Sequence, residues 1–136
     1  MTLDPNRTTR DYLYGRLLAV AHWAEQKTRD KDESPRPTNA ERFMTKFAVA
    51  PYTTWPFITK KLEPYLHKLQ SNVETIGWYN KAQWAFQEIH NAFAPDDYAS
   101  NKPLEGEFLL GYHCQISALY TGKPKKTDEQ DKSTEE

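Results

Sequence analysis

Apolar residues recur every three or four positions along much of this chain, which is the spacing of one face of an α-helix. The clearest stretch lies between residues 55 and 69, where the apolar positions fall within about 40° of one direction on a helical wheel. These positions are Trp55, Ile58, Leu62, Leu66 and Leu69. We expect this helix to begin near Thr53 or Thr54, with Pro56 tolerated in its first turn. Pro64 should bend it without ending it, because the apolar spacing continues beyond that proline.

A shorter helix is predicted directly before this one. Thr38 and Glu41 have the spacing of a capping box, in which the hydroxyl and the carboxylate each accept a hydrogen bond from a backbone amide. Pro51 should end the segment, because the residue before a proline is pushed out of the α region. The apolar face consists of Ala40, Phe43, Met44 and Phe47. The two helices are expected to form a corner with an apolar inside and a basic outside.

Two further helices follow from the same spacing. The first should span residues 8 to 29 and begin with a capping box formed by Thr8 and Asp11. Its core seam consists of Leu13, Leu17, Val20 and Ala24. The other should span residues 73 to 93 and bury Tyr79, Ala82, Phe86, Ile89 and Phe93. Trp84 falls nearly opposite Phe86 on that helix, where its indole is either packed under another helix or presented to a partner.

The last predicted helix, residues 104 to 120, is apolar almost all round, as expected of a helix surrounded by others. Gly106 and Gly111 are interpreted as places where another helix approaches closely, and Gly122 as the residue that ends the helix. Residues 123 to 136 contain no apolar side chain and are expected to be a disordered charged tail. The prediction is therefore an all-α fold, a compact bundle of about five helices in one domain over residues 1–122.

Composition excludes several classes of protein. The single cysteine, Cys114, rules out an internal disulfide framework and fits a reducing compartment. No apolar run approaches the roughly 20 residues that cross a membrane, and the first residues lack the apolar centre of a signal peptide. We therefore expect a cytoplasmic protein.

The net charge of −1 conceals a division along the chain. Residues 1–94 contain thirteen Lys and Arg against ten Asp and Glu, a balance of +3, and residues 95–136 contain five against nine, a balance of −4. An anionic partner is therefore compatible with the sequence, provided that the basic surface is local.

The sequence offers little support for an enzyme. The four histidines, His22, His67, His90 and His113, are never three or four residues apart, so no pattern typical of metal ligands is visible. No glycine-rich phosphate loop or nucleophile elbow is present. Asp96 and Asp97 could bind a divalent ion, but such an isolated pair is usually solvated. We expect no catalytic residue, no metal and no cofactor.

The basic residues on the predicted helices are the better candidates for a binding site. In one interpretation they are ordinary solvated faces of amphipathic helices; in the other they contact nucleic-acid phosphates without reading bases. The candidate phosphate-binding residues are Arg10, Arg16, Arg42, Lys46, Lys60, Lys61, Lys68 and Lys81. Trp23, Trp78 and Trp84 could stack on bases, but we assign them instead as core or subunit-interface residues.

Four segments together resemble a known family. They are residues 9–20 (TRDYLYGRLLAV), Arg42-Phe43, residues 50–57 (APYTTWPF) with residues 66–69, and residues 106–115 (GEFLLGYHCQ). In order and approximate spacing they look like the C-terminal helical region of the large subunit of type I-C CRISPR effector complexes. Each segment alone is a short helix pattern, but the ordered set over residues 9–120 is much more specific.

The resemblance implies a role and a set of partners. In that family the large-subunit gene also yields a separate small subunit by internal translation initiation, so the chain looks like this small subunit or like a fragment of the large one. The family implies a helical bundle, present in more than one copy, within the Cascade surveillance complex. There it would contact crRNA-bound backbone subunits, the large subunit and the target and non-target DNA strands of the R-loop. A purely architectural subunit without DNA contact remains the alternative.

Overall fold

The computed structural model describes residues 2–29 and 35–121. The helices are α1 (Arg10–Gln26), α2 (Asn39–Arg42), α3 (Met44–Val49), α4 (Pro51–Gln70), α5 (Ile76–Ala92) and α6 (Gly106–Thr121). No strand occurs in these two ranges, so the predicted all-α bundle is confirmed. The predictions for Gly122 and for residues 123–136 lie outside the described residues.

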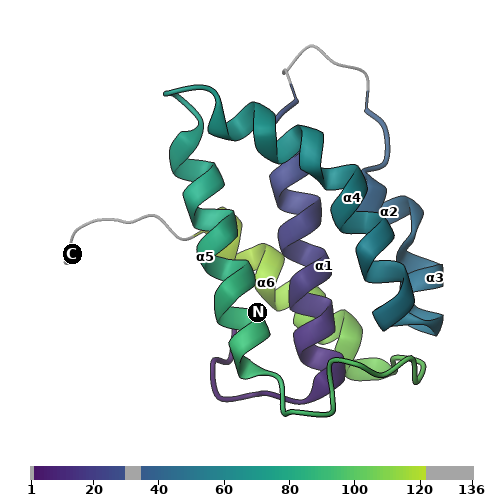
Figure 1. Cartoon of the computed structure of the whole chain (residues 1–136). Helices are drawn as coiled ribbons and strands as arrows, with labels where there is room; N and C mark the ends of the chain where they lie inside the picture. Colours follow the sequence, from purple (N-terminus) through teal and green to yellow (C-terminus); the bar gives the residue numbers. More distant parts are fainter. Residues whose placement is uncertain (1, 30–34, 122–136) are drawn as a thin grey trace.

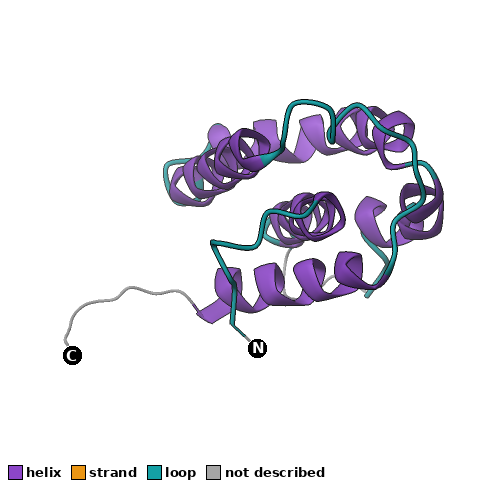
Figure 2. Cartoon of the chain, turned by 90° about the horizontal axis from the view of Figure 1, so that it is seen from below, coloured by secondary structure: helices purple, strands orange, loops and turns teal. Residues whose placement is uncertain are grey.

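Helix α1 lies in the middle of the bundle, with α6 on one side of it and α4 and α5 on the other (Figures 1 and 2). Its residues 12–21 are all buried, and so are Trp23, Ala24 and Glu25. The apolar character of residues 104–120 predicted that the helix there would be the surrounded one, and that prediction was wrong. Helix α6 exposes Leu109 and Tyr120 to solvent, so its apolar character does not mean burial on every side.

Two glycines bring α1 and α6 into backbone contact. A Cβ atom added at Gly15 would overlap the carbonyl oxygen of Phe108 and lie 2.8 Å from the amide nitrogen of Tyr112. A Cβ atom at Gly111 would likewise overlap the Tyr12 carbonyl. The close approach predicted at Gly111 is therefore confirmed. The one predicted at Gly106 was wrong, because a Cβ there has no neighbour within 4 Å.

The two predicted capping boxes have opposite outcomes. At α2, the Thr38 hydroxyl accepts a hydrogen bond from the Glu41 amide, and the Glu41 carboxylate accepts one from the Thr38 amide, as predicted. At α1, Thr9 is the N-cap residue and no side chain caps the helix, so the predicted box at Thr8 is absent. The Thr9 hydroxyl instead donates to Glu107 at the start of α6.

Residues 38–50 form two short helices in place of the single helix that was predicted. Phe43 leaves helical geometry at φ −99° and ψ 8°, which separates α2 from α3. Pro51 ends α3 as predicted, but it also occupies the first turn of α4, which begins two residues before Thr53. Helix α4 continues past both Pro56 and Pro64 to Gln70, as its apolar spacing indicated.

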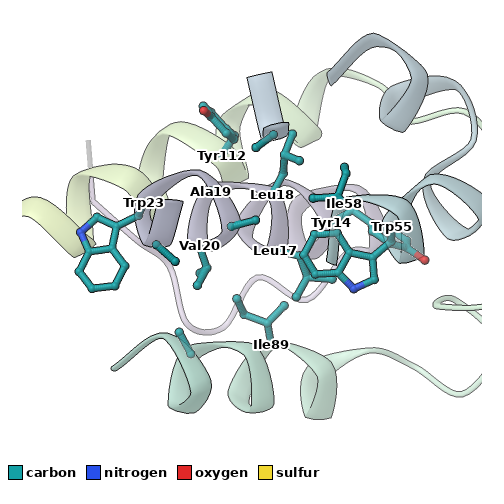
Figure 3. Packing of buried hydrophobic residues seen from close by; sticks show 14 of the residues in the cluster. Tyr14, Leu17, Leu18, Ala19, Val20, Trp23, Trp55, Ile58, Ile89 and Tyr112 are labelled. Carbon is teal, nitrogen blue, oxygen red and sulfur yellow. The ribbon is translucent and has the colours of Figure 1, made fainter. Parts of the chain in front are cut away.

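The core gathers on both sides of α1 (Figure 3). Val20 points toward Ile89 of α5, and Leu18 points to the opposite side of the helix. Trp23 lies at one end of the cluster and Trp55 at the other. At the latter end, the rings of Tyr14, Phe47, Trp55, Phe86, Phe93, Tyr98 and Phe108 form a continuous set of aromatic contacts.

Candidate nucleic-acid interface

The structure separates the eight candidate phosphate-binding residues into two groups. Four have side chains that hydrogen-bond within the bundle, and four point into solvent. The first group is spread over α1, the end of α4 and α5, and the second lies on α2, α3 and the middle of α4.

Arg16 is an interior residue. Its side chain on α1 is 3% exposed, its Nη2 lies 3.2 Å from Glu88 Oε1 of α5, and its Nε donates to Gln115 Oε1 of α6 at 2.7 Å. A buried cation needs such partners, because an unpaired charge in the interior is strongly unfavourable. This corrects the sequence-based assignment: Arg16 joins three helices and presents no cation to a phosphate.

Arg10, Lys68 and Lys81 are also held by groups of the bundle. Arg10 pairs with Asp11 at 3.0 Å and donates to the carbonyls of Ser100 and Lys102. The Nζ of Lys68 donates to the carbonyl of Thr28, and that of Lys81 to the carbonyl of Leu119, each at 3.3 Å. These three residues connect loops and helices of the bundle, so we leave them out of the candidate interface.

The remaining four residues form what we call the cation surface: Arg42, Lys46, Lys60 and Lys61. All four are exposed, and within the described ranges no hydrogen bond or ion pair engages their side-chain nitrogens. The Nζ of Lys61 lies 6.0 Å from the ring centre of Phe43, which places it above the junction of α2 and α3. Cations without internal partners keep their full charge available for an anionic ligand.

The chain turns back at Pro51, so that α2 and α3 lie beside α4. Helix α3 packs against α4, and the Thr54 hydroxyl donates to the Lys46 carbonyl at 3.2 Å. Further along, Lys61 reaches Phe43, so α2 and α3 run back beside α4. The chain reversal therefore places Lys61 beside the junction of α2 and α3, the two helices that carry Arg42 and Lys46.

The three tryptophans have three different environments. Trp23 is 1% exposed and lies in the core, so of the two expected roles, core or subunit interface, it has the first. Trp78 is 38% exposed, but the Nζ of Lys27 lies 4.6 Å from its ring centre and covers one face. Trp84 is 68% exposed on α5, where it remains a candidate contact for another protein.

An exposed aromatic residue, Phe57, lies beside Lys60 and Lys61 and was not among the residues predicted from the sequence. Phe57 of α4 is 61% exposed and precedes Lys60 and Lys61 by three and four residues. A helical wheel could have found it, because Phe57 lies about 140° from Leu62 and therefore off the apolar stripe.

A groove with a volume of about 520 Å³ lies between α4 and α5. Trp55, Leu62, Leu66 and Phe86 form its apolar wall, and Thr59, Glu63, Gln83, Gln87 and His90 its polar rim. Burial lowers the pKa of His90. Within the described ranges, no three His, Cys, Asp or Glu side chains are grouped closely enough to hold a metal ion.

No helix in the described part of the chain is both long enough and apolar enough to cross a membrane. Cys114 is buried and has no disulfide partner.

Comparison with known proteins gives one result that covers most of the chain. A search of curated proteins finds no match. The family model described as CRISPR-associated protein (Cas_Csd1) matches residues 1–120, a range that contains α1 to α5 and all but the last residue of α6. A match of this extent includes both the core and the cation surface, and the chain therefore belongs to the CRISPR-associated Csd1 family.

Proposed function

We propose that this chain is a non-catalytic small subunit of a type I-C CRISPR Cascade surveillance complex. In this role it contacts the DNA backbone of the R-loop without reading sequence, and it bridges the crRNA-bound backbone subunits and the large subunit in antiviral defence. Membership of the CRISPR-associated family supports a place in such a complex. Further copies of the chain are expected to lie beside it there.

The cation surface is the observation that carries the DNA contact. Arg42, Lys46, Lys60 and Lys61 lie on adjacent elements, and in the described ranges their side-chain nitrogens form no hydrogen bond or ion pair, although Lys61 lies over the Phe43 ring. Phosphate contacts of this kind supply affinity and position but carry no sequence information. In guided recognition, base pairing with the guide reads the sequence, so the protein needs to supply only charge and shape.

The test is the DNA affinity of the complex assembled with variant chains. If all four cations contact phosphates of a single strand, affinity falls roughly 50-fold between about 50 and 200 mM salt through these contacts alone. The Lys61→Gln change should reduce the slope of log affinity against log salt by about 0.7 to 0.9.

Lys102→Gln is the matched control for this measurement. Lys102 is exposed, carries the same charge and lies outside the cation surface, so its loss should leave the salt slope unchanged. Equal slopes for the wild-type complex and for one carrying all four neutral substitutions in the cation surface would overturn the DNA contact.

A second candidate is a purely architectural subunit, and the exposure of Trp84 favours it. The indole is 68% exposed, and two of its nearest charged neighbours on α5 have inward partners, Glu88 with Arg16 and Lys81 with the Leu119 carbonyl. An exposed ring without free charges around it suits a protein partner. In this case Trp84→Ala prevents assembly of the complex, and neutral substitutions in the cation surface do not change DNA affinity.

A further inference from the structure

The sequence suggested three tryptophans that could stack on bases, but the structure makes Phe57 the better candidate for this role. Trp23 is buried, and Lys27 covers one face of Trp78. Trp84 is exposed but lies on α5, which carries none of the four residues of the cation surface. Phe57 is the exposed aromatic residue that directly adjoins free cations.

The ring of Phe57 is also open to a ligand. The two aromatic residues that precede Phe57 on α4 contact other rings. Tyr52 meets Tyr98 at 5.5 Å and 90°, and Trp55 meets Phe47 and Phe86. In the described ranges, no ring or cation contact involves Phe57. A largely exposed phenylalanine with no ring partner offers both an apolar edge and a π-face to a ligand.

The spacing of Phe57 and its neighbours suits one nucleotide. Lys60 and Lys61 follow Phe57 by about one helical turn, so they lie about 4.5 to 6 Å further along the axis of α4. A base placed on the ring therefore leaves its phosphate near a lysine ammonium group. Proteins that bind single strands combine these two elements, an aromatic platform and a cationic path for the backbone.

We propose that Phe57 is a base-stacking platform that makes the cation surface selective for single-stranded nucleic acid. The inference rests on the proposed DNA contact and adds a preference that phosphate contacts alone do not give. Phosphates are present on single and double strands alike, whereas the faces of duplex bases are already stacked on each other. Charge complementarity with Arg42, Lys46, Lys60 and Lys61 favours a polyanion over an apolar protein segment as the occupant.

The experiment compares the binding of the full 136-residue chain to a labelled 15-nucleotide oligothymidylate and to a duplex of equal length at low salt. Phe57→Ala should weaken binding to the single strand about ten-fold and change duplex binding less than two-fold. Phe57→Trp should restore or increase single-strand affinity, because a larger ring keeps the stacking surface. An oligonucleotide of abasic nucleotides should bind wild-type and Phe57→Ala chains equally.

Two controls separate stacking from other effects. Trp84→Ala removes an equally exposed ring and should leave single-strand affinity unchanged. Phe57→Leu keeps an apolar side chain of similar reach without a π-face, so it should behave like Phe57→Ala. Thermal unfolding of each variant checks that the fold is intact, which is expected because Phe57 is 61% exposed.

The outcomes also distinguish this inference from the proposed function. If Lys61→Gln weakens binding to both DNA forms but Phe57→Ala weakens neither, the DNA contact stands and the stacking platform is overturned. If neither change has an effect, or the chain fails to bind the single strand at low salt, both are overturned. Equal losses on single and double strands, or a loss of subunit assembly with single-strand affinity unchanged, likewise overturn stacking.

Discussion

Arginine has opposite roles in two regions of the molecule. Around α1 it is buried and joins helices, whereas on the outer surface of α2 to α4 it is exposed to solvent. Arg16 on α1 is 3% exposed and bound to Glu88 and Gln115, whereas Arg42 on α2 is exposed and has no ion pair within the described ranges. The comparison shows that the number of cations says little about a binding surface. What matters is whether carboxylates and carbonyls of the same chain have already bound them.

The central place of α1 explains the difference. Every side of this helix meets another element, so a charged residue on it must find a partner inside the bundle. Glu25 obeys the same rule: it is 2% exposed, lies 3.2 Å from Arg29 and accepts a hydrogen bond from the Asn39 amide. Helix α4 has a solvent face on which cations can remain unpaired.

The largest expected effect lies at the crossing of α1 and α6. Gly15→Ala places a methyl group against the backbone of Phe108, and two helices must separate to admit it. We expect a loss of about 3 kcal/mol or more in unfolding free energy, measured by chemical denaturation. Helix α5 supplies the control: Gly77→Ala meets no atom within 4 Å and should stabilise the protein by about 0.5 to 1 kcal/mol. A fully stable Gly15→Ala variant would contradict the close contact.

A second prediction contrasts the two arginines directly. Arg16→Met leaves the buried side-chain oxygen of Gln115 without its donor, so unfolding free energy should fall by about 1 to 3 kcal/mol. Arg42→Met should change it by less than about 0.5 kcal/mol, because Arg42 is exposed.

In DNA binding, the larger effect is expected from Arg42→Met and the smaller one from Arg16→Met, the reverse of their effects on unfolding free energy. Arg42→Met is expected to lower the affinity of the assembled complex for DNA and to reduce the salt slope. Arg16→Met should leave the affinity of the folded complex unchanged. A loss of DNA affinity in Arg16→Met that exceeds the loss in Arg42→Met would reverse our assignment of the two regions.

The smallest expected effect depends on pH. His22 lies on α1 and faces the N-cap residue of α2, with its Nδ1 2.8 Å from the Thr38 hydroxyl oxygen, and burial lowers its pKa despite the opposing charges of Glu41 and Glu25. The unfolded chain therefore binds more protons near pH 6 than the folded one. Stability should fall as the pH drops below about 6.5 and recover above it.

The measurement is unfolding free energy between pH 5.5 and 8, compared in His22→Gln. This variant should lose part of the pH dependence, with His90 retaining a contribution in the same direction because burial also lowers its pKa. His113→Gln changes an exposed residue and serves as control. An unchanged pH profile in His22→Gln would show that the histidine does not contribute.

Local rules predicted the elements well where one interaction decides the outcome. The capping box at Thr38, the end of α3 before Pro51 and the passage of α4 through Pro64 all depend on residues close together in sequence. The central helix was misplaced, because apolar content does not reveal which side of a helix another one covers. Gly15 was missed for the same reason: its partner, Phe108, is 93 residues away.

Half of the candidate site could not have been predicted from sequence. Arg10, Arg16, Lys68 and Lys81 sit on helices in the same way as the four exposed cations, and only the fold brings carbonyls and a carboxylate to them. The positions of Lys60 and Lys61 followed from the helical wheel, since the strong apolar stripe of α4 leaves them outside.

The contact between α1 and α6 also constrains the order in which the protein can mature on the ribosome. Helix α1 is synthesised before α6, and the backbone that packs against Gly15 belongs to residues 108–112, almost a hundred positions later. Until that part of the chain emerges, one face of α1 is left in water, exposed to chaperones and to other nascent chains. Synthesis that stalls after α5 should therefore release an aggregation-prone intermediate, because α6 is needed to cover that face of α1.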